Sequence, residues 1–258
     1  MNTLAINTSG DELDVSTDYC RAEGIGLEVT AFAVPINLDG DIPALVKSHR
    51  IALTGITPVL AHGPFLDLVA TSQDPAIVAV ARRRHEVALA AAVHIGASFY
   101  IAHTNFTPLI RNPPYRKNWT NRMLEFWLPL ADTASKHNII ICLENMWEPA
   151  PDIQTDLIAA AQHPHLRASL DNGHALVFST IPTNSWVEAL GVSLGHCHLH
   201  DNSGELDEHQ SIGSGKENWP DLIAAIKEHA PQAILVAESV NLESNKASIE
   251  QLKNLNYI

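Results

Sequence analysis

Eight short apolar runs, rich in β-branched residues, recur along the chain, and segments of helical character separate them. The runs span residues 3–8, 24–32, 56–63, 97–104, 138–145, 166–173, 194–201 and 233–239. Continuous apolar runs of this length are typical of parallel strands that are buried on both faces. Because eight strand–helix repeats leave no strand over, they predict an α/β fold, the closed (β/α)8 or TIM barrel, instead of an open doubly wound sheet.

Three of the intervening segments carry clear helix signals. Asp74 and Gly96 are of the residue types that begin and end helices, so a helix is expected between them. A second expected helix begins at Thr120, and Pro129 inside it predicts a kink or a break. A third is expected over residues 218–231, which have a proline close to each end.

Composition narrows the class of protein. The chain has 258 residues, 46% of them hydrophobic, which is enough to fill one barrel core, and no shift in composition divides residues 1–258 into two domains. A formal net charge of −13 disfavours nucleic acid and anionic membranes as partners. The chain shows no signal peptide pattern and no apolar stretch of membrane-spanning length. Three cysteines without a CxxC spacing argue against a disulfide framework, so we expect a cytoplasmic protein, with a homo-oligomer as an open alternative.

Ionisable residues stand near the carboxyl ends of seven of the eight runs, although buried strands rarely contain them. They are Glu28, His62, His103, Glu144, Asp171, His198 and Glu238. One such residue alone is more often structural. In a barrel, however, all of these ends meet at one mouth, where barrel enzymes place their active sites. The seven together therefore favour a single shared site.

The alternation of side chains along a strand sharpens this hypothesis. Cys142 lies on the same face of its strand as Glu144. On a later strand, His196, His198 and His200 lie on one face, so we expect these three side chains to point into the barrel at successive levels toward the mouth. Carboxylates and neutral imidazoles together suit Zn²⁺, Mn²⁺, Co²⁺ or Fe²⁺ better than Mg²⁺ or Ca²⁺, which prefer oxygen ligands alone.

Seven short motifs follow one another at the ends of successive runs. They are LEVTAF (27–32), AHGPFLDL (61–68), IAHTNF (101–106), CLENMW (142–147), SLDNGHAL (169–176), HLHDNSGELDEHQSIGSG (198–215) and VAES (236–239). In this order they make the chain resemble the xylose isomerase-like TIM barrels, a superfamily of sugar isomerases, epimerases and endonuclease IV-type nucleases. The chain departs from the common pattern at His200, where relatives often carry Lys, and in IGSG, which replaces GEG.

The resemblance implies a set of metal ligands. In the epimerase branch one ion is held at the positions of Glu144, Asp171, His198 and Glu238. In the nuclease branch further zinc ligands fall at the positions of His62, His103, His174, Asp207 and His209. All nine positions carry ligand-type residues, so we expect one to three divalent ions, with zinc or manganese as the first choices.

The resemblance also implies a reaction. In an isomerase or epimerase, Glu144 and Glu238 would be the acid/base pair for a carbohydrate substrate, with or without a phosphate, and the ion would stabilise an enediolate. The alternative is a multinuclear zinc phosphodiesterase, in which a metal-bridging hydroxide attacks the diester. A non-catalytic barrel that binds a metal or ligand is the third possibility.

Substrate contacts are expected from Glu28, Trp147 and His200. Arg111 and Arg116 belong to a loop in which basic and aromatic residues alternate, a mixture that binds phosphates and stacks bases. The same loop is equally compatible with a solvated connection or a lid. The histidines expected on helix surfaces or helix ends are His49, His85, His94, His137, His163, His165 and His229.

Overall fold

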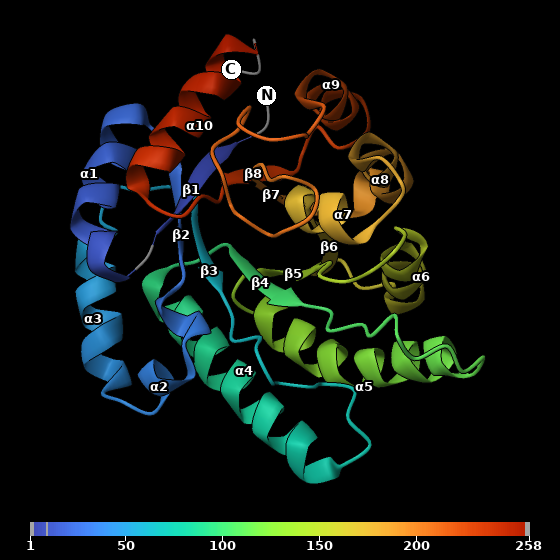
Figure 1. Cartoon of the computed structure of the whole chain (residues 1–258). Helices are drawn as coiled ribbons and strands as arrows, with labels where there is room; N and C mark the ends of the chain where they lie inside the picture. The colour runs from blue at the N-terminus through green and yellow to red at the C-terminus, as the bar shows by residue number, and fades with distance from the viewer. Residues whose placement is uncertain (1–2, 9, 256–258) are drawn as a thin grey trace.

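All eight expected strands form one closed parallel barrel in the computed structural model, which describes residues 3–8 and 10–255 (Figure 1). The strands are β1 Leu4–Thr8, β2 Gly26–Val29, β3 Val59–His62, β4 Phe99–His103, β5 Ile140–Glu144, β6 Leu166–Asp171, β7 Leu194–Leu199 and β8 Ile234–Ala237. Neighbours in the chain are neighbours in the sheet, and β1 pairs with β8 to close it. The predicted (β/α)8 barrel is confirmed.

Helices surround the barrel on its outer side (Figure 1). The α-helices are α1 Leu13–Glu23, α2 Pro35–Leu38, α3 Ile42–Ala52, α4 Pro75–Ile95, α5 Tyr115–Ser135, α6 Asp152–Ala161, α7 Asn172–Phe178, α8 Thr183–Leu190, α9 Trp219–His229 and α10 Leu242–Asn254. Three 3-10 turns, Gly10–Glu12, Ala31–Ala33 and Gly191–Ser193, complete the elements. Within the described ranges, none of these helices has the length and apolar character needed to cross a bilayer.

The ends of α4 follow the sequence signals. The Asp74 side chain accepts a hydrogen bond from a backbone N–H of the first turn, and Gly96 ends the helix in the left-handed conformation at φ 80°. Helix α5, by contrast, corrects the expectation at Pro129, because it runs through this residue without a break. Trp127 and Leu130 on either side of the proline are buried, and their packing holds the helix together despite one missing backbone donor.

The barrel interior has an apolar lower part and a polar upper part. Ala5, Leu60, Ile101, Ile234 and Val236 fill the lower part as a separate apolar cluster. The alternate residues of the same strands point outward and pack under the helices in the main core. Most ionisable side chains of the interior lie toward the carboxyl-terminal ends of the strands, where the connections to the helices form the mouth. Glu28 and His196 lie deeper, in register with Leu60 and Ile234 of the lower cluster.

Two histidines expected at the surface are buried, which corrects that part of the sequence-based expectation. His49 is 6% exposed and His85 3% exposed. Nδ1 of His85 lies 2.9 Å from the phenolic oxygen of Tyr100, a β4 residue that points outward under α4. Burial lowers the pKa of His85 to about 3, so its imidazole is neutral and serves as a packing and hydrogen-bonding residue.

Candidate metal centre

Several groups of histidines and carboxylates that could hold a metal ion meet at the barrel mouth, and three of them are described first. The first cluster is His62, His103 and Glu144, and the central cluster is Glu144, Asp171 and His198. The loop cluster is His174, Asp207 and His209. Within each cluster the candidate ligand atoms all lie within 4.8 Å of one another. The structure thus brings together residues from several strands, one helix and one loop that are far apart in the chain.

The first cluster joins the ends of three consecutive strands. Nε2 of His62 and Nε2 of His103 each lie 3.6 Å from a different oxygen of Glu144, beyond ordinary hydrogen-bond length. Two ligand atoms about 2.0–2.2 Å from one zinc ion are roughly 3–4 Å apart, so this spacing fits a shared cation. Nδ1 of His62 donates to the Gly63 carbonyl at 2.8 Å, which leaves Nε2 as the ligand atom. Burial lowers the pKa of His103 to about 4, so its imidazole is in the neutral form that metals bind.

His198 is the middle of the central cluster. Its Nδ1 atom lies 3.2 Å from Oε2 of Glu144 and 3.1 Å from Oε2 of Glu238. Burial opposes a charged imidazole, but Glu238, Glu28 and Glu144 raise the pKa of His198 well above its ordinary value. The position therefore favours positive charge, which either a proton on His198 or a metal cation provides.

Glu28 lies beneath this cluster and does not face the cavity. Its Oε1 is 2.9 Å from Nε2 of His198, and its Oε2 is 3.2 Å from Nε2 of His196. Nδ1 of His196 in turn lies 2.7 Å from the Ser169 hydroxyl, and all four residues are fully buried. Burial alone would raise the pKa of Glu28, but the two imidazoles lower it, so Glu28 is a carboxylate. It accepts the Nε2–H of His198 and leaves Nδ1 of that ring facing the cluster, as carboxylate partners of metal-binding histidines do.

The loop cluster forms where α7 follows directly on β6. Asp171 caps α7 by accepting the His174 backbone N–H at 2.7 Å. The His174 ring donates from Nδ1 to the Asn145 carbonyl at 2.9 Å, while its Nε2 lies 3.2 Å from Oδ2 of Asp207. Nδ1 of His209 is 3.3 Å from the other Asp207 oxygen. All three residues therefore present one ligand atom each to a common point.

The segment that carries Asp207 and His209 is anchored at its base. The backbones of Asp201 and Gln210 exchange two hydrogen bonds, of 2.9 and 2.8 Å, which closes residues 201–210 into a loop. The buried Asp201 carboxylate accepts the indole N–H of Trp219 at 2.8 Å, which ties the loop to the start of α9. This fixed base explains how residues outside any strand reach the mouth in a defined position.

His200 is fully buried and contacts ligands instead of open space. Its Nε2 lies 3.1 Å from both Asp171 oxygens, and its ring stacks on His209 with centroids 4.0 Å apart. A Cβ atom at Gly173 would overlap the His200 ring, so only glycine leaves room for it here. His200 also groups with Asp171, His209 and Glu238 as candidate ligands, so it adds to the nine positions expected from the sequence.

A cavity of about 160 Å³ opens above the clusters. Ligand-type residues line its floor, namely His62, His103, Glu144, His174, Asp207, His209 and Glu238. Its walls include Thr30, Ala33, Phe65 and Met146, none of which the sequence pattern singled out. Phe65 stacks on the His103 ring with centroids 4.4 Å apart. Phe65 lies in the HGPF segment that begins at His62, and Met146 lies in the ENM segment that begins at Glu144. Their closeness in sequence to these ligand positions could have identified them as cavity residues.

The other expected substrate residues lie outside this cavity. Arg116 forms ion pairs of 2.5 Å with Asp152 and Asp156 of α6. Trp147 is 37% exposed and, like the exposed Arg111, is not among the residues that line the cavity. The structure therefore unites all nine expected ligand positions but leaves these three side chains, and the buried Glu28, away from the space where a substrate would enter.

The residues present fit a divalent transition metal. Nδ1 of His198 and Oε2 of Glu144 are buried, and neither makes a hydrogen bond within the described ranges. Buried polar atoms are nearly always partnered, so this pair indicates a partner that can accept a lone pair from each atom. A cation is the ligand that two such lone pairs can share, and imidazole with carboxylate is a donor set that suits zinc or manganese.

Comparisons with known proteins agree with the fold. The family model described as xylose isomerase-like TIM barrel matches residues 19–256. A solved protein of Thermus thermophilus, soaked with ZnCl₂, is 26% identical, with 98% of this chain and 96% of that chain covered and a TM-score of 0.80. A D-tagatose 3-epimerase-like protein is 21% identical, with 98% and 97% covered and a TM-score of 0.78. A D-psicose 3-epimerase, solved in the presence of D-fructose, is 16% identical, with 92% and 84% covered and a TM-score of 0.73.

Among curated sequences, an uncharacterised protein of Methanocaldococcus jannaschii is 24% identical over 258 residues, 98% of each chain. A second uncharacterised protein of the same organism is 24% identical over 211 residues, 76% of this chain and 69% of its own. The likeness thus extends along nearly the whole chain and includes every strand end that carries a candidate ligand. The chain belongs to the xylose isomerase-like TIM barrel family.

Proposed function

We propose that the protein is a divalent-metal-dependent isomerase or epimerase of a small sugar. One observation carries the proposal: Glu144 and Glu238 approach the same atom, Nδ1 of His198, at 3.2 and 3.1 Å, and both line the cavity. Two carboxylates beside one cation position can supply the base that removes a proton and the acid that returns one. At about 160 Å³ the cavity is below the roughly 300–1,000 Å³ of drug-sized pockets, so it suits a small substrate.

A divalent ion held by Glu144, Asp171, His198 and Glu238 would act as a Lewis acid toward oxygens of the sugar. Glu144 and Glu238 would exchange the carbon-bound proton, one carboxylate accepting it and the other returning a proton. Burial would raise the pKa of Glu238, but His198 and His209 lower it, so this carboxylate stays ionised at neutral pH, in the form that can accept a proton. Phe65 and Met146 on the cavity walls would exclude water from the reacting carbon.

The similarity to epimerases supports this reaction class. The D-tagatose 3-epimerase-like protein and the D-psicose 3-epimerase share the barrel along more than nine-tenths of this chain. The second of these was solved in the presence of D-fructose, so ketoses are the first substrates to test. The protein soaked with ZnCl₂ makes zinc the first ion to test.

A multinuclear zinc phosphodiesterase is the second candidate. The loop cluster supports it, because His174, Asp207 and His209 complete the nine-residue set that the resemblance implies for three ions. The charge of the chain and the pairing of Arg116 with two aspartates oppose it, since a nucleic acid backbone needs free cationic side chains.

The test is proton exchange at a sugar carbon. The purified protein, with metal content measured by elemental analysis, is incubated with zinc or manganese and a ketose in D₂O, and NMR follows deuterium entry. Glu238→Gln is expected to abolish exchange while part of the metal is retained, whereas Glu205→Gln, an exposed position on the loop of residues 201–210, leaves exchange unchanged. The absence of exchange across a ketose panel, together with hydrolysis of bis(p-nitrophenyl) phosphate or abasic DNA, would replace the proposal with the phosphodiesterase.

A further inference from the structure

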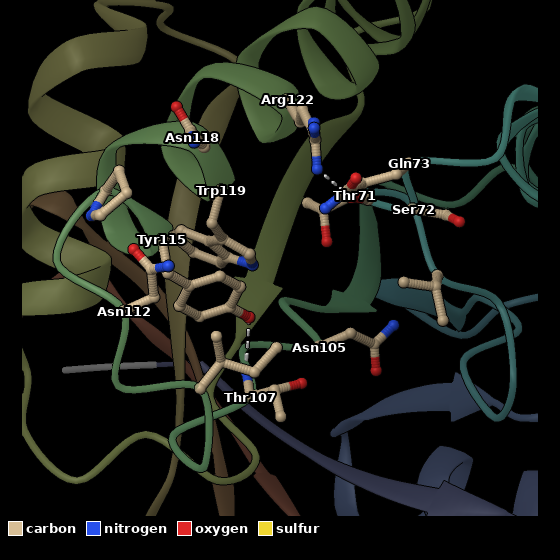
Figure 2. Close-up of a pocket in the computed structure, with 13 residues that line it drawn as sticks. Thr71, Ser72, Gln73, Asn105, Thr107, Asn112, Tyr115, Asn118, Trp119 and Arg122 are labelled. Carbon is tan, nitrogen blue, oxygen red and sulfur yellow. Dashed lines mark hydrogen bonds between the residues drawn. The ribbon is translucent and has the colours of Figure 1, made fainter.

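A second and larger pocket lies beside the barrel mouth (Figure 2). We name it the α5 pocket. It has a volume of about 330 Å³, and its walls come from the β3–α4 connection, the β4–α5 connection and the first two turns of α5. None of the residues that line it lines the metal cavity. Nevertheless, Asn105 in its wall stands only two residues after His103, so the two spaces share their supporting loops.

The charge of the α5 pocket is opposite to that of the chain. Aspartate and glutamate side chains are absent from its described lining, and Arg122 is its one cationic side chain. The other polar groups are amides and hydroxyls, with Tyr115 and Trp119 as aromatic walls (Figure 2). In a protein of net charge −13, a concave site whose single charge is positive favours an anionic ligand.

Arg122 has donor groups to spare. Its Nη1 donates to the Thr71 carbonyl at 3.2 Å, which holds the guanidinium at the pocket wall. Within residues 3–8 and 10–255, no carboxylate forms an ion pair with it, unlike Arg84, which pairs with Asp39 at 2.6 Å. A guanidinium carries five N–H donors and binds phosphate or carboxylate in a planar fork.

Trp119 provides an independent observation. It is 1% exposed, and its indole Nε1–H has no acceptor within the described ranges. Figure 2 shows that the indole nitrogen faces the space bounded by Tyr115, Thr71 and Asn105. The ring is fixed by an edge-to-face contact with Phe106, at 5.2 Å between centroids. Because buried donors are nearly always partnered, an acceptor atom is expected in this space.

The start of α5 adds to the attraction for an anion. Pro114, Tyr115 and Asn118 in the lining belong to the amino-terminal end of a 21-residue helix, and no side chain caps this end. The backbone N–H groups of Tyr115 and Asn118 already donate, to the carbonyls of Asn112 at 2.9 Å and Pro114 at 3.0 Å. The contribution of this helix end is therefore the positive end of the helix dipole, which favours negative charge. The same kind of ligand, an anion with hydrogen-bond acceptor atoms, is therefore favoured by the helix end, by Arg122 and by Trp119.

We propose that the α5 pocket binds the oxyanion group, phosphate or carboxylate, of a small molecule, with Arg122 and the Trp119 indole N–H as donors. Tyr115 adds a third donor, because its hydroxyl oxygen already accepts the Thr107 N–H at 3.0 Å and its own hydrogen remains to be given. This site is separate from the metal clusters and does not depend on their chemistry.

The test uses the full chain after metal removal with EDTA, so that phosphate has no metal to bind. Inorganic phosphate, D-ribose 5-phosphate and D-gluconate are titrated by calorimetry, with D-ribose as the uncharged control. Loss of the charged donor in Arg122→Gln is expected to weaken oxyanion binding by about tenfold or more, and loss of the neutral indole donor in Trp119→Phe by severalfold. Arg50→Gln is the matched control, because Arg50 is an exposed arginine of α3 outside the lining, so this variant should bind with the affinity of the wild type.

A second measurement locates the ligand without relying on variants that must fold identically. The Trp119→Phe spectrum identifies the Trp119 indole N–H resonance among those of the five tryptophans. Phosphate or gluconate should shift that resonance and leave Trp127 unmoved, since Trp127 is also unpartnered but lies outside the pocket. Binding of inorganic phosphate and D-ribose 5-phosphate but not of D-gluconate would indicate that the ligand carries a phosphate. Binding of D-gluconate would indicate a sugar acid. Binding that is undetectable for all three probes, or equal in Arg122→Gln and the wild type, would overturn the proposal.

Discussion

Nδ1 of His198 and Oε2 of Glu144 lie 3.2 Å apart, yet neither buried atom makes a hydrogen bond within the described ranges. Two lone pairs at this distance repel each other unless a proton or a cation lies between them. Glu28 accepts the other ring N–H of His198 at 2.9 Å and so keeps Nδ1 directed toward Glu144. The same geometry therefore makes metal binding and proton binding compete for one atom.

This competition predicts a pH dependence of metal affinity. Carboxylates raise the pKa of His198 and His174 well above the ordinary value, against the effect of burial, and raise that of His209 to about 9. Below these pKa values the imidazoles carry protons that an ion must displace, so zinc affinity should rise with pH up to about 9. Calorimetry at about pH 7 in buffers of different ionisation enthalpy should show proton release. An observed enthalpy independent of the buffer would contradict this prediction.

Glu28 is predicted to support metal binding without touching the ion. Glu28→Gln keeps an acceptor for the His198 ring but removes the negative charge, and partner residues of this kind change metal affinity by about 10–100-fold. We expect Glu28→Gln to weaken zinc binding by about tenfold, and Glu28→Ala by more. Competition with a chromogenic chelator measures the affinity, and Glu205→Gln serves as the exposed control. Wild-type affinity in both Glu28 variants would refute the role.

The number of ions should depend on which cluster is changed. Asp207→Asn alters the loop cluster alone, so it should lower the zinc content by one ion if that cluster is occupied. Glu144→Gln alters the first and the central clusters together and should lower the content further. Elemental analysis after dialysis against a fixed zinc concentration gives both numbers. An unchanged zinc content in Asp207→Asn would show that the loop cluster does not hold an ion of its own.

Glu148 is predicted to make stability pH-dependent. It is 1% exposed, and burial raises its pKa to about 7, although the Thr104 hydroxyl and the Met146 N–H donate to it. Since the folded pKa lies above the unfolded one, the folded state prefers the protonated form. The corresponding stability is fully present below about pH 4.5 and is lost as the pH rises through 7.

Glu148→Gln imitates the protonated carboxyl at every pH. It should therefore be more stable than the wild type at about pH 8, by about 2–3 kcal/mol, and nearly equal to it at about pH 5. Urea unfolding at the two pH values measures the difference. Glu188→Gln, an exposed carboxylate on α8, should show no such trend. A difference that is the same at both pH values would point to packing instead of ionisation.

The sequence was sufficient for the fold because each buried strand is a local apolar run. Strand bounds were overestimated, as at residues 24–32, where the strand is only Gly26–Val29, because the apolar run continues into the turn at Ala31–Ala33. The course of α5 was similarly difficult to predict. Pro129 by itself predicts a break in the helix. The helix continues because Trp127 and Leu130 on either side of the proline are buried, which a local sequence pattern does not reveal.

The ligands at strand ends were predictable because strand order and alternation together place them at one mouth. The position of Glu28 deep in the barrel could not be predicted in this way, because it depends on the register between β2 and β3. Glu28 lies beside Leu60, one inward-facing residue below His62. Arg116 shows another limit, since its partners Asp152 and Asp156 lie on the next helix and no local pattern connects them. The position of Asp207 required the resemblance, because a loop has no periodicity that orients its side chains.

Glu144 belongs to two clusters, and this sharing has a thermodynamic consequence. An ion in the first cluster draws on the same carboxylate that an ion in the central cluster needs, so the occupancies of the two positions are linked. If the first ion changes the affinity for the second by some factor, the second ion changes the affinity for the first by the same factor. The two metal positions would then fill with positive or negative cooperativity as the metal concentration rises. The Glu144 carboxylate on β5 would determine how steeply their occupancy depends on that concentration.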